Sequence, residues 1–132
     1  MRLLVFGSRS WVDVPHLTIV RTLDALSPPP SAVIEGEARG ADSLARLWAS
    51  SRGVAVERFP VDNAKDGPWP AAGHRRNARM HREGKPDAAI GFISGKVGEP
   101  LSRGSAGMVE ICKRAGTPLR IVREDGEEIA SA

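Results

Sequence analysis

Short apolar segments alternate with segments of helical periodicity along most of the 132-residue chain. Apolar runs at residues 2–6, 32–34, 54–59, 87–93 and 118–122 resemble strands that are covered on both faces. Between them, apolar residues recur at helical spacing in segments near residues 15–27, 41–52, 71–83 and 105–115. This alternation predicts a single-domain α/β fold, with a three-layer, doubly wound parallel sheet of about five strands in the order 3-2-1-4-5.

Two segments fall outside this alternation. Residues 60–70 are rich in Pro and Asp and lack periodicity, so they predict a long loop, in which Trp69 between two prolines indicates a packed lid. Residues 124–132 begin with acidic side chains and predict a frayed end. The predicted organisation is one domain over residues 1–123, followed by an acidic C-terminal tail over residues 124–132.

Charge and cysteine content narrow the functional classes. The formal net charge is +3, and all but four of the nineteen Lys and Arg residues are arginines. Arginine binds phosphate through a planar fork, although a GC-rich coding sequence explains the excess of arginine over lysine equally well.

The single Cys112 excludes an intrachain disulfide and favours a cytoplasmic location, and no apolar stretch is long enough to span a membrane. His16, His74 and His81 do not combine with Cys112 at metal-ligand spacing, so no metal site is predicted.

Two glycine-containing corners are suited to an anion. The first, Gly7-Ser8-Arg9, follows the opening strand, and the second, Gly104-Ser105-Ala106-Gly107, begins the last helix. Small residues at a helix N-terminus leave N–H groups open to a phosphate. The alternatives are an ordinary turn for the first corner and a plain Ser or Gly N-cap for the second.

Two carboxylates follow the second strand, in a turn that contains Gly36 and Gly40. In one interpretation, Glu35 or Asp42 accepts hydrogen bonds from ribose hydroxyls or from an arginine. In the other, the role is structural, and Asp42 stabilises the N-terminus of its helix. The sequence leaves both interpretations open.

The helix near residues 71–83 carries two sets of arginines. Arg76 shares a face with Ala72 and Met80, so its guanidinium needs an anionic ligand or a carboxylate partner such as Asp42 or Asp62. We favour a ligand role for Arg76 and its neighbour Asn77. A separate stripe is interpreted as a solvated surface or a track for a phosphate backbone, and it consists of Arg75, Arg79 and Arg82.

Several of these motifs occur in an order that resembles a known family, the YspA-like, YpsA-related branch of the SLOG superfamily. The resemblance covers residues 1–123 and lies in Gly7-Ser8-Arg9 with Trp11, Glu35-Gly36 through Gly40-Ala41-Asp42, Ala72-Gly73 with Arg76-Asn77 and Met80, and Gly104-Ser105 with Met108-Val109. It implies a Rossmann-like domain that binds a nucleotide or a nucleotide-derived ligand related to NAD or ADP-ribose. It also implies a homo-oligomer, because relatives in the superfamily are often dimers.

One departure bears on catalysis. The related "lonely guy" phosphoribohydrolases carry a P-G-G-x-G-T-x-x-E motif whose glutamate acts in N-glycosidic cleavage. In this chain Met108 occupies the glutamate position, and Glu110 lies about 200° further around the helix. A hydrolase would therefore need Glu35, Asp42 or Asp62 as its acid or base.

The leading hypothesis is binding or sensing of a small-molecule nucleotide whose phosphate lies between the Gly7 and Gly104 corners. The first alternative is an N-glycosidic hydrolase at the same site. The second is single-stranded nucleic-acid binding through Arg75, Arg79 and Arg82, with Trp11 or Trp69 as stacking surfaces. The candidate ligand-binding residues are Gly7, Ser8, Arg9, Gly36, Gly40, Asp42, Arg76, Asn77, Gly104, Ser105, Ala106 and Gly107.

Overall fold

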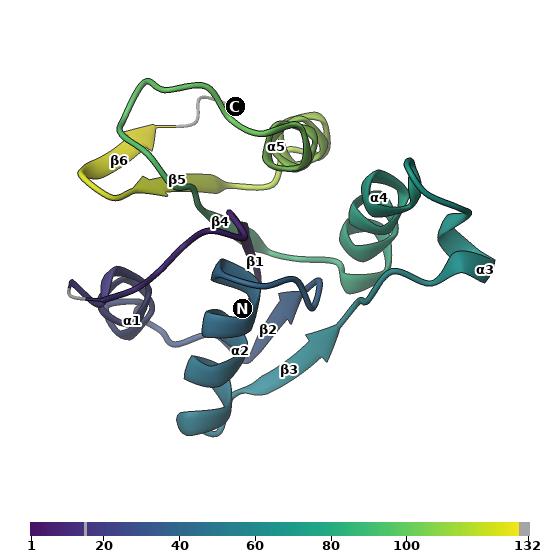
Figure 1. Ribbon diagram of the computed structural model, residues 1–132. Coiled ribbons are helices and arrows are strands. Elements are labelled where there is room, and N and C mark those ends of the chain that lie inside the picture. The colour runs from purple at the N-terminus through teal and green to yellow at the C-terminus, as the bar shows by residue number, and fades with distance from the viewer. Residues whose placement is uncertain (15, 130–132) are drawn as a thin grey trace.

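The computed structural model describes residues 1–14 and 16–129. These residues form one β-sheet with parallel and antiparallel strands, together with the helices that cover it (Figure 1). The strands are β1 (Arg2–Gly7), β2 (Ala32–Glu35), β3 (Ala55–Arg58), β4 (Ala88–Phe92), β5 (Leu119–Arg123) and β6 (Gly126–Ile129). The helices are α1 (Thr18–Asp24), α2 (Ala41–Ser51), α3 (Asn63–Asp66), α4 (Ala72–Gly84) and α5 (Arg103–Ala115).

The sheet has the strand order β3-β2-β1-β4-β5-β6, and its first five members are parallel. The predicted order 3-2-1-4-5 is therefore confirmed, with one strand added at the edge. β6 runs antiparallel to β5, so the prediction of a frayed end is wrong for residues 126–129. Residues 124 and 125 of the predicted tail form the turn between β5 and β6, and residues 130–132 lie outside the described residues.

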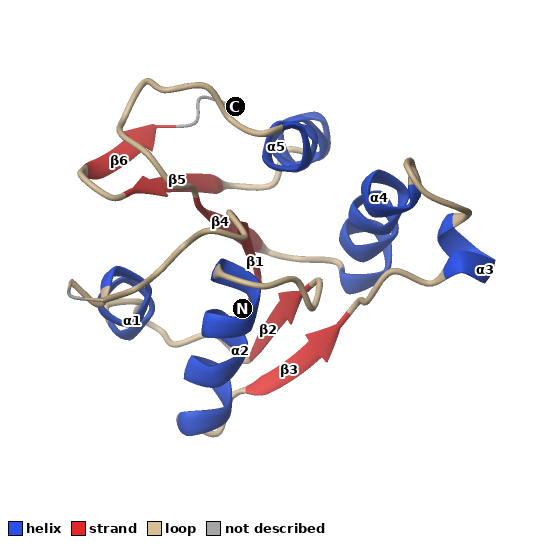
Figure 2. Ribbon diagram, in the orientation of Figure 1, coloured by secondary structure: helices blue, strands red, loops and turns tan. Residues whose placement is uncertain are grey.

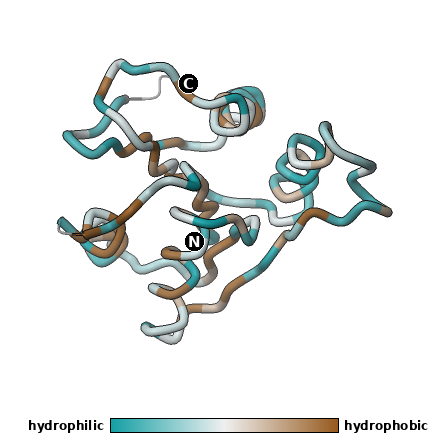
Figure 3. The backbone as a smooth tube through the Cα atoms, in the orientation of Figure 1, coloured by the Kyte–Doolittle hydropathy of each residue, from teal (hydrophilic) through white to brown (hydrophobic). Residues whose placement is uncertain are grey.

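Two apolar clusters cover the two faces of the sheet. Leu3 and Val5 of β1 pack with α1 and α2, whereas Leu4 and Phe6 pack with α4 and α5. This alternation follows from the period of two along a strand. Figure 2 shows α1 and α2 on one side of the strands and α4 and α5 on the other, and Figure 3 shows that hydrophobic residues follow the central strands. The three-layer prediction is confirmed.

The start of α1 is fixed by a side chain upstream of the helix. Oδ1 of Asp13 accepts the backbone N–H of Ile19 at 2.8 Å and the indole N–H of Trp11 at 3.0 Å. Asp13 thereby satisfies an N-terminal donor of the helix from outside it. The helix begins at Thr18, and Pro15, which the sequence suggested as its first residue, lies outside the described residues.

The segment between β3 and α4 contains the short helix α3, which the predicted continuous loop did not include. Asp62 caps it, since its carboxylate accepts the N–H of Ala64 at 2.9 Å. Trp69 is 85% exposed, so the prediction of a packed lid around this side chain is wrong. Among the described residues, no helix has both the length and the apolar character needed to cross a membrane.

Candidate functional site

A pocket of about 260 Å³ opens at the carboxyl ends of β1, β2 and β3. Three walls of the pocket come from the segments that follow these strands. Arg9 in the loop after β1 forms the first wall, the turn after β2 forms the second, and the segment after β3 forms the third. Arg76 reaches the pocket from α4. In doubly wound sheets, ligands bind at this edge of the strands. The lining consists of Arg9, Gly36, Glu37, Ala38, Pro60, Val61 and Arg76.

Arg76 is buried, and backbone carbonyls rather than a carboxylate hold its guanidinium. Nη1 donates to the carbonyl oxygens of Gly36 and Phe59, and Nε donates to Oδ1 of Asn77 at 3.0 Å. Burial lowers the pKa of Arg76, while the negative charge of Asp42 opposes this shift. The sequence correctly placed Arg76 on an inward face, and Asn77 serves to orient it.

Gly36 leaves the space that the Arg76 guanidinium occupies. A Cβ at this position would lie 2.7 Å from Nη1 and 2.8 Å from Cζ of Arg76. Any larger residue would therefore push the guanidinium out of the pocket wall. The role of this glycine is steric, and its own N–H donates to Oδ2 of Asp42 at 3.1 Å.

Two carboxyl groups hold the turn that forms the second wall. Oδ2 of Asp42 accepts the N–H of Gly36 and, at 3.3 Å, the N–H of Ala38, while Oε2 of Glu35 accepts the intervening Glu37 N–H at 2.6 Å. Both carboxyl groups are buried, and neither lines the pocket. The structure thus supports the structural interpretation of Glu35 and Asp42 over direct contact with ribose.

The same two carboxyl groups have raised pKa values. Burial raises the pKa of Glu35 to about 7, the Glu37 N–H opposes the rise, and the nearby Asp42 adds to it. Burial also raises the pKa of Asp42, against the stabilising effects of the Ala38 N–H and of Arg76. A carboxyl group that titrates near neutral pH therefore lies behind the pocket wall.

The pocket brings two arginines together. Among the described residues, neither Arg9 nor Arg76 forms a salt bridge with a carboxylate. The positive charge of Arg9 contributes to the lowered pKa of Arg76, which indicates that the two guanidinium groups repel each other. An anion between them would relieve this repulsion.

The first predicted corner is largely occupied by contacts within the fold. The Ser8 N–H donates to the Phe92 carbonyl at 2.9 Å, and Ser8 Oγ accepts the Ser94 N–H at 2.8 Å. Gly40 has a φ of 74°, and a Cβ there would lie 2.6 Å from the Arg9 carbonyl oxygen. These contacts place the Arg9 backbone beside the β2–α2 turn.

The second predicted corner does not line the pocket. The N-cap of α5 is Ser102, whose hydroxyl accepts the Ser105 N–H at 3.4 Å, and Ser105 is buried. Gly107 faces α4, since a Cβ there would lie 3.1 Å from Nδ1 of His74. A serine N-cap thus begins the helix, but it is Ser102 and not a residue of the Gly104 to Gly107 corner. Gly104 to Gly107 do not line the pocket with Arg9 and Arg76.

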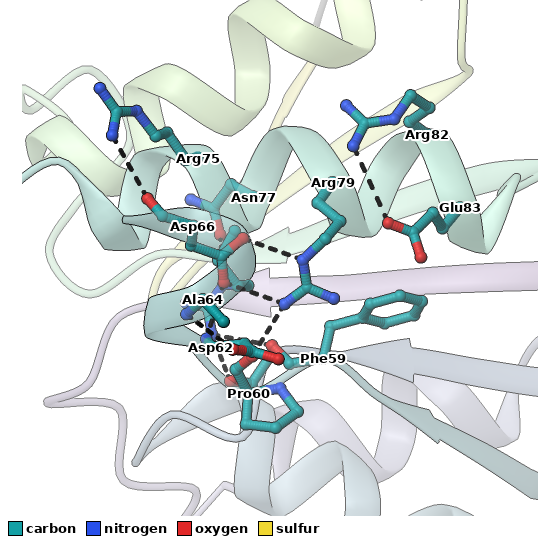
Figure 4. Close-up of polar contacts among 12 residues, drawn as sticks. Phe59, Pro60, Asp62, Ala64, Asp66, Arg75, Asn77, Arg79, Arg82 and Glu83 are labelled. Carbon is teal, nitrogen blue, oxygen red and sulfur yellow. Dashed lines mark hydrogen bonds and ion pairs between the residues drawn. The ribbon is translucent and has the colours of Figure 1, made fainter. Parts of the chain in front are cut away.

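The arginine stripe of α4 divides into buried and exposed members (Figure 4). Arg79 is buried, and its guanidinium donates to both carboxylate oxygens of Asp66, at 2.9 and 3.0 Å, and to the Pro60 carbonyl at 2.9 Å. Arg75 and Arg82 are exposed. The prediction of a continuous surface stripe is therefore wrong at Arg79, which joins α4 to α3.

The remaining candidates have structural surroundings. Trp11 is buried and packs edge-on against Phe92, with 5.7 Å between ring centroids, so it offers no open stacking surface. Met108 is buried in the core, and Glu110 is exposed and pairs with Arg114. Within residues 1–14 and 16–129, no group of three or more His, Cys, Asp or Glu side chains is arranged to hold a metal ion.

Sequence reasoning missed four residues that line the pocket: Glu37, Ala38, Pro60 and Val61. Glu37 and Ala38 lie inside the turn that was singled out only for its glycines and carboxylates. Pro60 and Val61 follow β3 directly, so the rule that ligands bind at carboxyl ends of parallel strands could have indicated them.

The strand order, the three layers and the pocket at the carboxyl edge define a Rossmann-like α/β domain. A solved structure of this class is DNA processing protein A (DprA) from Streptococcus pneumoniae, with a TM-score of 0.52 and 15% identity. The match covers 89% of this chain but 57% of DprA, so the chain spans little more than half of that protein, and the likeness concerns the fold alone.

Sequence comparison identifies the family. The sequence pattern of the YspA, cpYpsA-related SLOG family (YAcAr) matches residues 1–65. The Gene 61 protein of Mycobacterium phage D29 is 35% identical over 126 residues, covering 89% of this chain and 93% of the phage protein. The chain belongs to the YspA, cpYpsA-related SLOG family, as the resemblance of its motifs indicated.

Proposed function

We propose that the chain binds a nucleotide or a nucleotide-derived ligand through a phosphoryl group held between Arg9 and Arg76. The observation that carries this proposal is the pairing of two guanidinium groups in one pocket without a carboxylate partner among the described residues. Arginine matches the geometry and charge of phosphate. Membership of the family and the Rossmann-like fold support a nucleotide-related ligand.

The proposal differs in position from the sequence hypothesis. The phosphoryl group binds in the Arg9–Arg76 pocket, beside the turn that follows β2, and the N-terminus of α5 takes no part. Neither alternative function gains support from the geometry, because the candidate carboxylates for hydrolysis hold turns and caps, and Arg79 and Trp11 of the nucleic-acid hypothesis are buried. Self-association and a cytoplasmic location stay predictions from the sequence.

Replacing Arg9 with alanine tests the pocket without disturbing the fold, because this side chain is exposed. Titration calorimetry with AMP, ADP-ribose and NAD should show binding of at least one of them, whereas adenosine, which lacks phosphate, should bind far more weakly. Loss of one charge-assisted contact weakens binding by roughly tenfold or more in Arg9→Ala.

The matched control is Arg21→Ala, which removes the same charge from the exposed surface of α1, outside the pocket. Its affinity should equal that of the wild-type protein. Equal affinities for Arg9→Ala and Arg21→Ala, or no binding of any phosphorylated probe by the folded protein, would exclude this site.

A further inference from the structure

Glu35 is a buried side chain with an oxygen that lacks a hydrogen-bond partner. The residue is 0% exposed, and within the part of the chain that the structure describes, Oε1 receives no hydrogen bond. Oε2 accepts only the Glu37 N–H. A buried oxygen without a partner is costly, and the cost is greater for a charged carboxylate than for a neutral acid. The surroundings of Glu35 therefore favour its protonated form.

The side chain lies directly behind the wall of the Arg9–Arg76 pocket. Gly36 and Glu37 follow it in the chain and line that pocket. Charged groups of four neighbouring segments lie near Glu35, and one of them, its register partner Arg58 on β3, pairs with Glu37 at 3.2 Å. These groups are Asp42 and Arg46 of α2, Glu37 of the turn, Arg58 of β3, and Arg76 of α4.

We propose that the pocket binds its anion together with a proton, which Glu35 takes up from solution. This inference rests on the proposed function, because it requires an anion between Arg9 and Arg76. The positive charge of Arg76 favours ionisation of Asp42 and, to a smaller extent, of Glu35. An anion beside Arg76 offsets that charge and makes both carboxyl groups harder to ionise.

Of the two carboxyl groups, Glu35 is placed to gain the proton. Asp42 keeps two backbone N–H donors that stabilise its charge, whereas Glu35 has one donor and one bare oxygen. Burial raises the pKa of Glu35 to about 7, so its carboxyl group is partly protonated at neutral pH. Proton uptake therefore occurs at Glu35 near neutral pH.

The coupling has a defined sign. Because anion binding raises the pKa of Glu35, the anion binds most tightly below the pKa of the free protein and progressively more weakly as pH rises through it. Each unit by which binding raises that pKa corresponds to a tenfold weaker affinity at high pH. For a rise of about one unit, the dissociation constant grows about sevenfold between pH 6 and pH 8.5.

Inorganic sulfate is the probe, because it is a tetrahedral dianion that does not titrate in this range. Calorimetry at pH 7 in two buffers of different ionisation enthalpy should show uptake of roughly half a proton per sulfate bound. In Glu35→Gln, which keeps the size of the side chain and an oxygen acceptor, the uptake should vanish. Its affinity should then be independent of pH and close to the wild-type affinity at pH 6.

The control is Glu110→Gln, which neutralises an exposed carboxylate on α5 outside the pocket and should retain the proton uptake. A second measurement covers the case in which Glu35→Gln fails to fold. In wild-type protein with ¹³C-labelled glutamate, the carboxyl resonance of Glu35 should titrate near neutral pH and shift to a higher midpoint with saturating sulfate.

The possible results separate this inference from the proposed function. Sulfate binding without proton uptake, or with an uptake that persists in Glu35→Gln, would overturn the role of Glu35 and leave the Arg9–Arg76 pocket standing. Absence of sulfate binding at pH 6, together with absence of binding by the phosphorylated probes, would overturn both.

Discussion

The Gly7→Ala variant is expected to lose about 3 kcal/mol or more of its free energy of unfolding. Gly7 ends β1 and pairs in register with Phe92 of β4. An added Cβ would lie 2.8 Å from the Phe92 carbonyl carbon, closer still to its oxygen, and 2.9 Å from Cβ of Ala41. Two of these atoms belong to the backbone of a central strand, so the clash cannot be relieved by rotating a side chain.

The effect should extend to the loop that carries Arg9. The Ser8 N–H donates to the Phe92 carbonyl, the same group that the new methyl would displace. Separation of β1 from β4 at this point would therefore move Ser8 and Arg9 together. Urea unfolding followed by circular dichroism measures the loss of stability.

Gly73→Ala is the matched control for this substitution. Gly73 lies in the first turn of α4, and a Cβ there meets no atom within 4 Å. Alanine is the better helix former by up to about 1 kcal/mol, so this variant should be as stable as the wild-type protein or slightly more stable. Equal stability of the two variants would show that β1 and β4 do not approach as closely as described.

The core of the fold was predictable because each layer is encoded by local apolar spacing. Leu3 to Phe6 alternate between the two clusters, and the central strands are short apolar runs that both faces cover. β6 escaped prediction because Gly126–Ile129 carries two glutamates in place of an apolar pattern. Its attachment depends on Arg120 and Arg123 of β5, which pair with Glu127 and Glu128.

The candidate site was only partly predictable, because its contacts depend on backbone groups. The face shared by Ala72, Arg76 and Met80 predicted that Arg76 points inward. Its partners are the carbonyl oxygens of Gly36 and Phe59, and residue types alone give no signal for a carbonyl. The small residues at the start of α5 predicted a phosphate site at that corner. The prediction did not take into account that the Ser102 hydroxyl already caps the helix.

Arg79 shows a second reason why sequence reasoning did not predict the surroundings of a side chain. Helical spacing groups it with Arg75 and Arg82, and on that basis the three residues share one exposed stripe. The four-residue helix α3 has too little periodicity to be recognised, yet it places Asp66 against Arg79. A contact between two elements decided the burial of this arginine, and the spacing along α4 could not reveal it.

Arg79→Ala is expected to destabilise the protein several-fold more than a substitution of an exposed arginine on α4, because it leaves the Asp66 carboxylate without its cation. Hydrogen bonding by Arg79 lowers the pKa of Asp66 to about 2, below the ordinary value of 3.8. The pair therefore stabilises the wild-type protein above pH 4, and this contribution is lost as pH falls toward 2. In Arg79→Ala the pKa of Asp66 rises, so this acid-dependent loss of stability should flatten.

Arg75→Ala provides the comparison, since Arg75 lies one turn earlier on the same helix and is exposed. Its only described contact with Asp66 is a 3.5 Å hydrogen bond to the backbone carbonyl, so its stability should stay within about 0.5 kcal/mol of wild type. Unfolding measured from pH 2 to pH 7 distinguishes the two variants. Identical curves would mean that the Arg79–Asp66 pair does not hold α3 against α4, and that the Pro60–Val61 wall of the pocket is supported in some other way.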